Sequence, residues 1–329
     1  MHYHDDVYGD VTIGEPVLQA LMRSTAINRL RSVLQHGISG LIGITTPVTR
    51  FEHSMGVMLL VQQMGGSLQE QIAALLHDVS HTAFSHVIDF VFDGHNSQSY
   101  HEEIKERYIG QTDLPALLAY YGYDWYDFVD EEAFTLLEQP APRLCADRLD
   151  YFLRDSLELD LATPADVNHL LQHLTVHDGR IVTNDLSAAR WLGYTYIAAD
   201  KASWANFREV GLYELTARAI RRALDIELLH ETDLWEIDET VWRLLHEADD
   251  PYLRENLALV TRHTSFVWDE ENPSFRVQTK LRSVDPDVVL DDGSMQSLSQ
   301  IDSHFGEYRL SYHRDREGLW PMRVVVSQK

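Results

Sequence analysis

The stretch LLHDVSHTAFSH, residues 75–86, places three histidines and an aspartate in a segment that otherwise has the pattern of a buried helix. Asp78 lies between His77 and Val79 in this apolar setting, and burial of an unpaired carboxylate is costly unless a cation lies nearby. Adjacent residues such as His77 and Asp78 are about 100° apart around a helix axis. An ion that contacts both must therefore lie beside the helix and take its other ligands from elsewhere. The segment thus predicts several helices packed around a shared polar centre.

Two other interpretations of these histidines are open at this point. A histidine on an apolar helical face is most often a core or interface residue, which would suit His77, His81 and His86 taken singly. The spacing of His77 and His81 also matches the H-E-x-x-H pattern of zinc peptidases. That pattern needs a glutamate as general base, and this chain has the shorter Asp78 in its place.

The chain is strongly acidic. Its 329 residues include 27 Lys and Arg against 52 Asp and Glu, which gives a net charge of −25. This charge disfavours binding to nucleic acid or to an anionic membrane, so an anionic substrate would need a local basic pocket. Cys145 is the single cysteine, which excludes an intrachain disulfide. No apolar run approaches membrane-spanning length and no signal-peptide pattern is visible, so we predict a soluble cytoplasmic protein.

Helical periodicity covers most of the chain and predicts a mainly α fold. We expect helices over residues 15–37, 54–66, 69–94, 101–109, 113–121, 130–137, 142–157, 164–173, 185–229 with interruptions, and 238–262. After about residue 265 the pattern changes, and residues 308–328 resemble two strands around a turn at DREG. We therefore predict a helical domain over residues 1–264 and a small α+β appendage over residues 265–329.

Two further motifs add polar residues to helical segments. TRFEHSMGV places His53 one helical turn after Arg50, at the start of an apolar helix. DRLDYFLRDS places Asp147, Tyr151 and Asp155 at spacings of four, so they share one helical face. Taken alone, such a charged helix is usually a solvated surface element. Together with the histidine-rich segment, it offers further ligands for the same centre and argues against the peptidase interpretation.

Five motifs in order, NRLRSVLQHG, TRFEHSMGV, LLHDVSHTAFSH, SYHEE and DRLDYFLRDS, resemble those of the HD-domain phosphohydrolases. The resemblance is to the branch that holds the dGTP and dNTP triphosphohydrolases. It covers roughly residues 6–160 well and continues weakly beyond them. It implies that the helical part of the chain is an HD-domain helical bundle.

The resemblance implies a set of side chains that hold one divalent metal ion in the family's H…HD…D pattern. These ligands are His53, His77, Asp78 and Asp147. Two imidazoles and two carboxylates suit both borderline and hard divalent ions, so Mn, Fe, Co, Ni, Zn and Mg all remain open.

The resemblance also implies catalytic roles beside the attacked phosphate. His81, one turn after the HD pair, and His101 in the SYHEE motif would lie next to that phosphate and donate protons. Asp89 would be the partner of His101 and raise its basicity.

Five positions match residues that contact the substrate in the family. Arg50 and Arg148 would contact phosphate groups, for which the guanidinium fork is well suited. Gln35, Tyr151 and Asp155 would contact the sugar.

Three residues depart from the family pattern. Ser80 stands where a glycine is usual, Val48 where a histidine is usual, and His36 where an apolar residue is usual. The metal set is intact, but the nucleoside preference is left open. The segment KLRSVDPDVVL, residues 280–290, has no role that the resemblance assigns.

The chemistry implied is hydrolysis of a small phosphorylated substrate. Attack on a phosphate ester needs charge neutralisation and an activated water together, and a metal site with open positions supplies both. The resemblance implies a (deoxy)nucleoside triphosphate that is cleaved to nucleoside and tripolyphosphate. Two alternatives stay open, an HD enzyme that acts on another phosphoester and a nucleotide-sensing module without turnover. Members of the family form homodimers or larger assemblies, so the resemblance is also consistent with a homo-oligomer.

Overall fold

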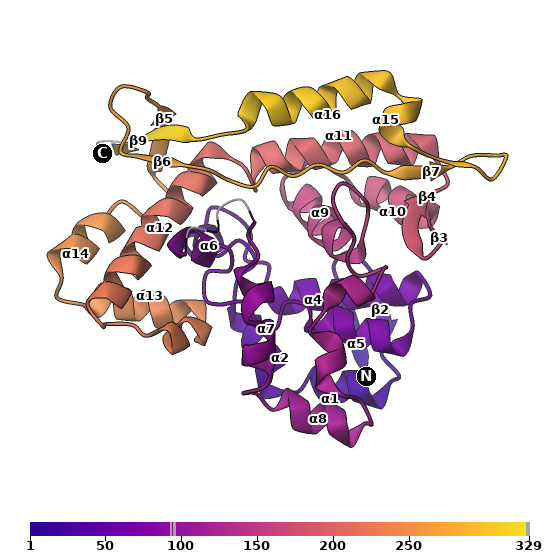
Figure 1. Cartoon of the computed structure of the whole chain (residues 1–329), viewed down its shortest axis with the longest axis horizontal. Coiled ribbons are helices and arrows are strands. Elements are labelled where there is room, and N and C mark those ends of the chain that lie inside the picture. Colours follow the sequence, from indigo (N-terminus) through magenta and orange to yellow (C-terminus); the bar gives the residue numbers. More distant parts are fainter. Residues whose placement is uncertain (93, 95–96, 327–329) are drawn as a thin grey trace.

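The computed structural model describes residues 1–92, 94 and 97–326. In these residues helices dominate, and three small sheets lie at the edges of the molecule (Figure 1). The predicted mainly α fold with a small α+β part is therefore confirmed. No helix within the described ranges is both long and apolar enough to cross a bilayer.

The N-terminal part is a hairpin followed by short helices. Its elements are β1 (His2–Asp5), β2 (Gly9–Thr12), α1 (Pro16–Leu21), α2 (Thr25–Arg29), the 3-10 helix η1 (Leu30–Ser32) and α3 (Ile38–Leu41). The single helix expected over 15–37 is wrong. The chain leaves the helical path after α1, and the Ser24 side chain then accepts a hydrogen bond from the Ile27 amide to begin α2. Ser24 thus acts as an N-cap, which starts a new helix.

Three helices form the centre of the molecule: α4 (Arg50–Gln63), α5 (Leu68–Leu76) and α9 (Ala146–Glu158). A reciprocal capping box between Thr49 and Glu52 starts α4 earlier than expected. Gly56 lets α4 approach α9 closely, since a Cβ atom there would lie 1.9 Å from Asp150 Oδ1. This approach brings the polar residues of the two helices together.

The continuous helix expected over 69–94 is wrong. α5 ends at Leu76, α6 spans only Val87–Val91, and the intervening residues form turns, with Phe84 and Ser85 at positive φ. Tertiary partners replace the helical hydrogen bonds of these turns. Arg29 donates to the carbonyls of Val79 (2.9 Å) and His81 (2.6 Å). His77 and His81 are therefore not neighbours on one helical face, which removes the basis of the peptidase interpretation.

The next part of the chain holds α7 (Tyr100–Ile109), α8 (Leu114–Tyr120), and the 3-10 helices η2 (Trp125–Phe128) and η3 (Glu131–Ala133). The helices expected at 101–109 and 113–121 are confirmed. The one at 130–137 is wrong, because only η3 forms. Beyond it, the Leu136 amide donates to Glu70 Oε1 at 2.8 Å instead of continuing a helix.

The remaining helices of the predicted helical domain lie within the expected ranges, except for one 3-10 helix at residues 231–235, which lies between the ranges 185–229 and 238–262. They are α10 (Pro164–His173), α11 (Leu186–Ala202), α12 (Phe207–Asp225), the 3-10 helix η4 (Glu231–Trp235), α13 (Asp238–Glu247) and α14 (Pro251–Leu257). Between α10 and α11 lies an additional hairpin of β3 (Leu174–His177) and β4 (Arg180–Thr183).

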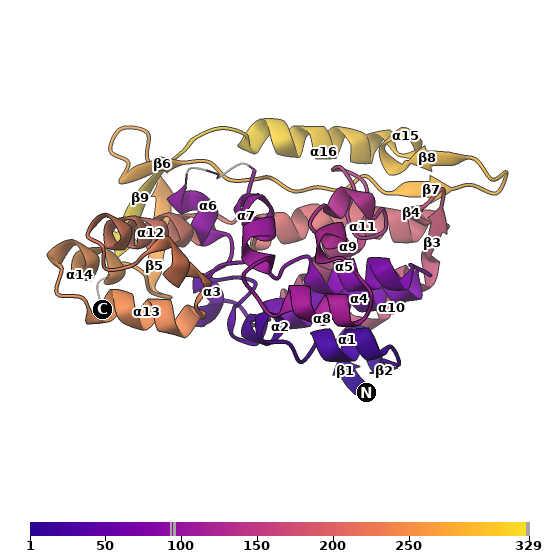
Figure 2. The ribbon, with the colours of Figure 1, turned by 60° about the horizontal axis from the view of Figure 1, so that its bottom comes forward.

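The C-terminal region contains β5 (Thr264–Trp268), β6 (Phe275–Val277), β7 (Asp287–Val289), β8 (Met295–Ser297), α15 (Leu298–Ile301), α16 (Ser303–Arg316) and β9 (Trp320–Val326). β9 lies between β5 and β6 in an antiparallel sheet, whereas β7 pairs in parallel with β4. The latter sheet thus crosses the domain boundary that the sequence predicts at residue 264. α16 runs beside α11 (Figures 1 and 2).

The two-strand interpretation of residues 308–328 is wrong in its first half, and residues 327–329 lie outside the described ranges. Residues 308–316 belong to α16, whose buried Phe305 and Tyr312 are two helical turns apart. Leu310 is 64% exposed although it is apolar. An interpretation based on alternating apolar and polar residues therefore wrongly counts it among the buried positions of a strand. Phe305 packs against Gly193 of α11, where a Cβ atom would lie 2.7 Å from the ring.

Asp238, the first residue of α13, joins two distant loops near the centre of the protein. Its carboxylate accepts hydrogen bonds from the backbone amides of Leu34 (2.9 Å) and Phe84 (2.8 Å), and the residue is 2% exposed. We expect Asp238→Ala to lower the free energy of unfolding by about 2–4 kcal/mol, because two buried N–H groups lose their acceptor. Chemical denaturation measures the change. Glu239→Ala, at the next and exposed position, should change it by less than about 0.5 kcal/mol, and equal effects would contradict the role of Asp238.

Candidate metal centre and active site

One cavity of about 480 Å³ opens where α4, α7, α9, α11 and α12 meet the C-terminal region. Most of the residues that the sequence predicts for the site line it. They are Gln35, Arg50, His77, Asp78, His81, His101, Asp147, Arg148, Tyr151 and Asp155. His53 lies directly behind this wall, 1% exposed and in contact with His77 and Asp147.

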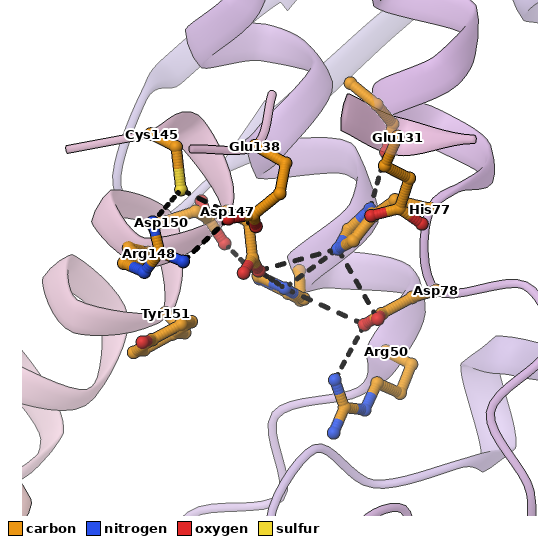
Figure 3. A network of polar contacts seen from close by, with 12 residues as sticks. Arg50, His77, Asp78, Glu131, Glu138, Cys145, Asp147, Arg148, Asp150 and Tyr151 are labelled. Carbon is orange, nitrogen blue, oxygen red and sulfur yellow. Dashed lines mark hydrogen bonds and ion pairs between the residues drawn. The ribbon is translucent and has the colours of Figure 1, made fainter. Parts of the chain in front are cut away.

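Four of these side chains direct polar atoms at one point. His53 Nε2 lies 3.2 Å from His77 Nε2 and 3.0 Å from Asp147 Oδ1. Asp78 completes the group, with Oδ1 3.5 Å from His77 Nε2 and Oδ2 3.7 Å from His53 Nε2. Figure 3 shows Asp147 of α9 approaching His77 and Asp78, which follow one another directly after α5. We call these four side chains the metal group.

The far side of each imidazole in the metal group faces an acceptor. His53 Nδ1 is 2.8 Å from Asp150 Oδ2, and His77 Nδ1 is 2.7 Å from the Ala74 carbonyl. Each Nδ1 must therefore carry the hydrogen, because its partner can only accept. In the neutral rings both Nε2 atoms then present lone pairs, next to two carboxylates. Four electron-rich atoms at one point repel unless a cation lies between them, so these residues fit a divalent ion.

The pKa values of the metal group also indicate that it favours a positive charge. Burial lowers the pKa of His77, but the carboxylates of Asp78 and Asp147 outweigh it and raise this pKa to about 10. Burial raises the pKa of Asp78, but Arg50 and His77 together hold it well below its ordinary value. Burial raises the pKa of Asp147, but its contacts with His53 and His77 outweigh this effect and hold the pKa well below its ordinary value. Both carboxylates of the group are thus ionised at neutral pH.

Arg50 stands at the edge of the metal group. It donates from Nη1 to Asp78 Oδ2 (2.7 Å) and from Nε to Ser85 Oγ (2.9 Å), and it is 4% exposed. Its guanidinium therefore orients Asp78 so that the other oxygen, Oδ1, faces His77 and His81.

Beside Arg50 lies a cluster of three histidines, His81, His86 and His101, which we call the histidine trio. The rings of His81 and His101 stack with centroids 3.9 Å apart, and His86 stands edge-on to both. Within the described residues, the Nδ1 atoms of His81 and His101 are buried without a hydrogen-bond partner, whereas His81 Nε2 lies 3.1 Å from Asp78 Oδ1. Burial and the charge of Arg50 lower the pKa of His81 to about 3. The trio is thus neutral and has free nitrogens beside the metal group.

Asp89 does not take the position that the sequence predicts for it. Its Oδ2 is 2.9 Å from His86 Nδ1 and its Oδ1 accepts from the Tyr100 amide at 3.1 Å, so it partners His86 and not His101. The early end of α5 causes this difference, because the turns before α6 place His86 between Asp89 and His101. His86 was missed as a site residue, although it is the third histidine of LLHDVSHTAFSH.

Three predicted substrate contacts already have protein partners. Arg148 donates to Glu138 Oε1 (2.6 Å) and to the Gln139 carbonyl (2.5 Å). Tyr151 and Tyr196 share a hydrogen bond between their hydroxyl groups. The third contact, Asp155, has His36 and Trp204 as its partners.

Asp155 lies 2.9 Å from His36 Nε2 and accepts from Trp204 Nε1 (2.6 Å). His36 is thus held against Asp155 in the cavity wall and does not face an apolar region. Gln35 differs from these residues, because its side-chain oxygen is buried with no hydrogen-bond partner among the described residues.

Sequence reasoning also missed residues that support or line the site. Asp150 orients His53, and its signal was its place three residues after Asp147 on α9. Lys280 and Arg282 line the cavity from the segment whose role the sequence left unassigned. The sequence feature that could have identified them is the pair of basic residues close together in a strongly acidic chain.

Comparison with known proteins agrees with this geometry. The HD domain family matches residues 50–152, which contain all four residues of the metal group. The metal-dependent phosphohydrolase cns2 of Cordyceps militaris is 38% identical over 291 residues, which are 86% of this chain and 84% of that protein. The chain belongs to the HD-domain metal-dependent phosphohydrolases. A divalent metal ion is therefore its cofactor, and its substrate is a phosphorylated molecule.

Other matches extend over nearly the whole of this HD phosphohydrolase. The uncharacterized protein YdhJ of Bacillus subtilis is 36% identical over 97% of this chain and 98% of its own length. The crystal structure of a phosphohydrolase from Bacteroides thetaiotaomicron superposes with a TM-score of 0.68 at 17% identity, over 92% of this chain and 94% of that one. The C-terminal region is thus part of the shared fold.

The deoxynucleoside triphosphate triphosphohydrolases are more distant. The SAMHD1 homolog of Dictyostelium discoideum is 24% identical over 54% of this chain and 40% of its own length. The HD-family part of the resemblance is confirmed, whereas the branch within the family has only distant support.

We expect His77→Ala and Asp147→Ala to remove bound divalent metal from a protein that stays folded, because each deletes a ligand atom from the metal group. Thermal stability should also fall, since a bound ion joins α4, α9 and the turn after α5. Asp150→Ala should weaken metal affinity by about 10- to 100-fold, as for loss of a residue that orients a ligand. Elemental analysis and metal titration measure these changes, with Glu158→Ala on the same helix as control. Full metal content in His77→Ala and Asp147→Ala would exclude this metal group.

Proposed function

We propose that this HD phosphohydrolase hydrolyses a (deoxy)nucleoside triphosphate to nucleoside and tripolyphosphate, with His53, His77, Asp78 and Asp147 as the metal ligands. The observation that carries the proposal is the composition of one cavity. It joins the metal group, unpartnered neutral histidines, basic side chains and an aromatic wall. Its volume of about 480 Å³ lies within the usual range for small-molecule sites, about 300–1,000 Å³.

The phosphate end of the cavity is built for an anion. The chemistry that a divalent ion supplies when bound is neutralisation of phosphate charge and activation of a water molecule. Arg50 adds a fixed positive charge next to Asp78. His81 and His101 are neutral, and each offers a ring nitrogen without a partner among the described residues. We assign them hydrogen bonds to phosphate oxygens or to the leaving oxygen, as the free nitrogens otherwise carry a desolvation cost.

The nucleoside end lies beyond Tyr151. The Tyr151 ring is 6.2 Å from the His53 ring and 4.9 Å from the Trp204 ring, so it stands between the metal group and the pair of Trp204 and Asp155. Gln35 adds an unpartnered amide oxygen to the same cavity. A sugar held against Tyr151 places its nearest phosphorus, the α-phosphorus, beside the metal group. Water then adds to this phosphorus, the bond to the 5′ oxygen breaks, and that oxygen leaves as the hydroxyl of the nucleoside.

A second candidate substrate is a nucleotide with a single phosphate. The observation that favours it is the engagement of Arg148 with Glu138, which offsets the charge that a polyphosphate tail would use. The same α-phosphorus chemistry would then release orthophosphate in place of tripolyphosphate.

His81 offers a test of the phosphate end. We expect His81→Ala to keep its metal and to lose turnover by about 10²- to 10³-fold, because a neutral hydrogen-bond donor to the phosphate is removed. Steady-state kinetics and elemental analysis on the same preparation measure both quantities. His246→Ala, an exposed histidine on α13, is the control. Stoichiometric loss of metal in His81→Ala would make His81 a ligand instead.

The products decide between the candidate substrates. We expect wild-type protein with a divalent ion to convert a nucleoside triphosphate in one step to nucleoside and tripolyphosphate, since the α-phosphorus is the one beside the metal group. Chromatography of early time points separates these products. Nucleoside diphosphate with orthophosphate as first products would refute this geometry. Turnover of nucleoside monophosphates alone would establish the second candidate.

A further inference from the structure

Residues 278–286 cross the molecule as an extended segment from β6 to β7 (Figure 1). Tertiary contacts fix its path. The Arg282 amide donates to Asp200 Oδ2 at 2.7 Å, and the Asp285 amide donates to the Pro142 carbonyl at 2.9 Å. Val284 between them is fully buried in the main core. The backbone that carries the side chains of this segment is therefore held in a fixed position.

Lys280 and Arg282 line the cavity from this segment. Lys280 Nζ donates to the Ser97 carbonyl at 3.1 Å, and the Arg282 guanidinium donates to the Gln98 amide oxygen and to the Lys280 carbonyl. All these partners are neutral. Among the described residues neither side chain has a carboxylate within ion-pair distance, whereas Arg50 and Arg148 are paired with Asp78 and Glu138.

The two cations also act on each other and on the predicted site. Burial and the charge of Arg282 lower the pKa of Lys280, and the carboxylate of Glu102 offsets only part of this effect. Burial lowers the pKa of Arg282, but the nearby Tyr151 hydroxyl group and the Asp200 carboxylate outweigh it and raise this pKa. The charge of Arg282, with burial and that of Arg50, lowers the pKa of His86 in the histidine trio. Two close cations in a cavity wall with no carboxylate within ion-pair distance among the described residues repel one another, and an anionic ligand relieves this repulsion.

We propose that Lys280 and Arg282 bind the phosphates of the substrate that lie beyond the one attacked. This subsite rests on the proposed function and gives it chain-length selectivity, because a monophosphate does not reach both cations. It also assigns the tail contact to the C-terminal region rather than to Arg148, which Glu138 already neutralises. The ligand class is an inorganic or nucleoside polyphosphate.

Lys280→Met keeps the aliphatic stem and removes the charge. We expect it to weaken binding of inorganic tripolyphosphate to the metal-loaded protein by about tenfold or more, the usual loss for one charged hydrogen bond. Orthophosphate binding should change by less than about threefold, since Lys280 is assigned only to the phosphates beyond the one attacked. Isothermal titration measures both affinities. Arg276→Met, an exposed arginine on β6 outside the cavity, should change neither. Arg282→Gln should repeat the selective loss in a protein whose thermal midpoint shows that it is folded.

The two proposals fail separately. The subsite is overturned if Lys280→Met weakens the binding of tripolyphosphate and of orthophosphate equally, or weakens neither. This holds even if the wild type releases tripolyphosphate from nucleotides. A selective loss of tripolyphosphate binding supports the subsite even if the wild type hydrolyses no nucleoside triphosphate, and in that case only the proposed substrate is overturned.

Discussion

The convergence of lone pairs from His53, His77, Asp78 and Asp147 is the constraint on which the rest of the structure depends. Two imidazole nitrogens 3.2 Å apart that both face carboxylates need a cation or a proton between them, and the pKa of His77 is accordingly raised to about 10. The fold holds them there because each is oriented from behind. A chain of buried ionic contacts runs from His53 to Asp150, then to Arg154 (2.8 Å), and from Arg154 to Asp5 of the N-terminal hairpin (2.8 Å). The first strand of the protein thus helps to position a ligand contributed by α4.

Two neighbouring regions of the cavity differ in the charge that they favour. Asp78 belongs to both, since Arg50 binds one of its oxygens and the other faces His77 and His81. On one side the carboxylates raise the pKa of His77 and favour a cation. On the other side burial and Arg50 lower the pKa of His81 and keep the trio neutral. The buried ion pair of Arg50 and Asp78 therefore lies at the boundary between a region suited to a metal ion and an adjacent region suited to a phosphate.

The metal group was predictable because its residues lie in short motifs whose chemistry is local. Asp78 in an apolar segment already called for a cation, and the motifs around His53 and Asp147 offered the remaining ligands. The role of Asp89 and the break in the helix expected over 69–94 could not be predicted, because tertiary partners determine both. Arg29, Asp238 and the Leu234 carbonyl bind the backbone of the turns before α6. The strand expected within α16 was wrong because the exposed Leu310 hides the helical spacing of the buried residues on that helix.

The position of the C-terminal region follows from the charge of the whole chain. A protein with a net charge of −25 repels an anionic substrate unless basic groups are concentrated where it binds. Many arginines here form ion pairs with nearby carboxylates, as Arg50, Arg148 and Arg154 do, so they contribute little net positive potential. Lys280 and Arg282 differ because their partners among the described residues are neutral oxygens. A segment that the local motifs left without a role thus brings to the cavity two basic side chains that form no ion pair with the described residues. The HD motifs by themselves predict the metal group, whereas the basic residues of the proposed phosphate subsite reach the cavity only through the complete fold.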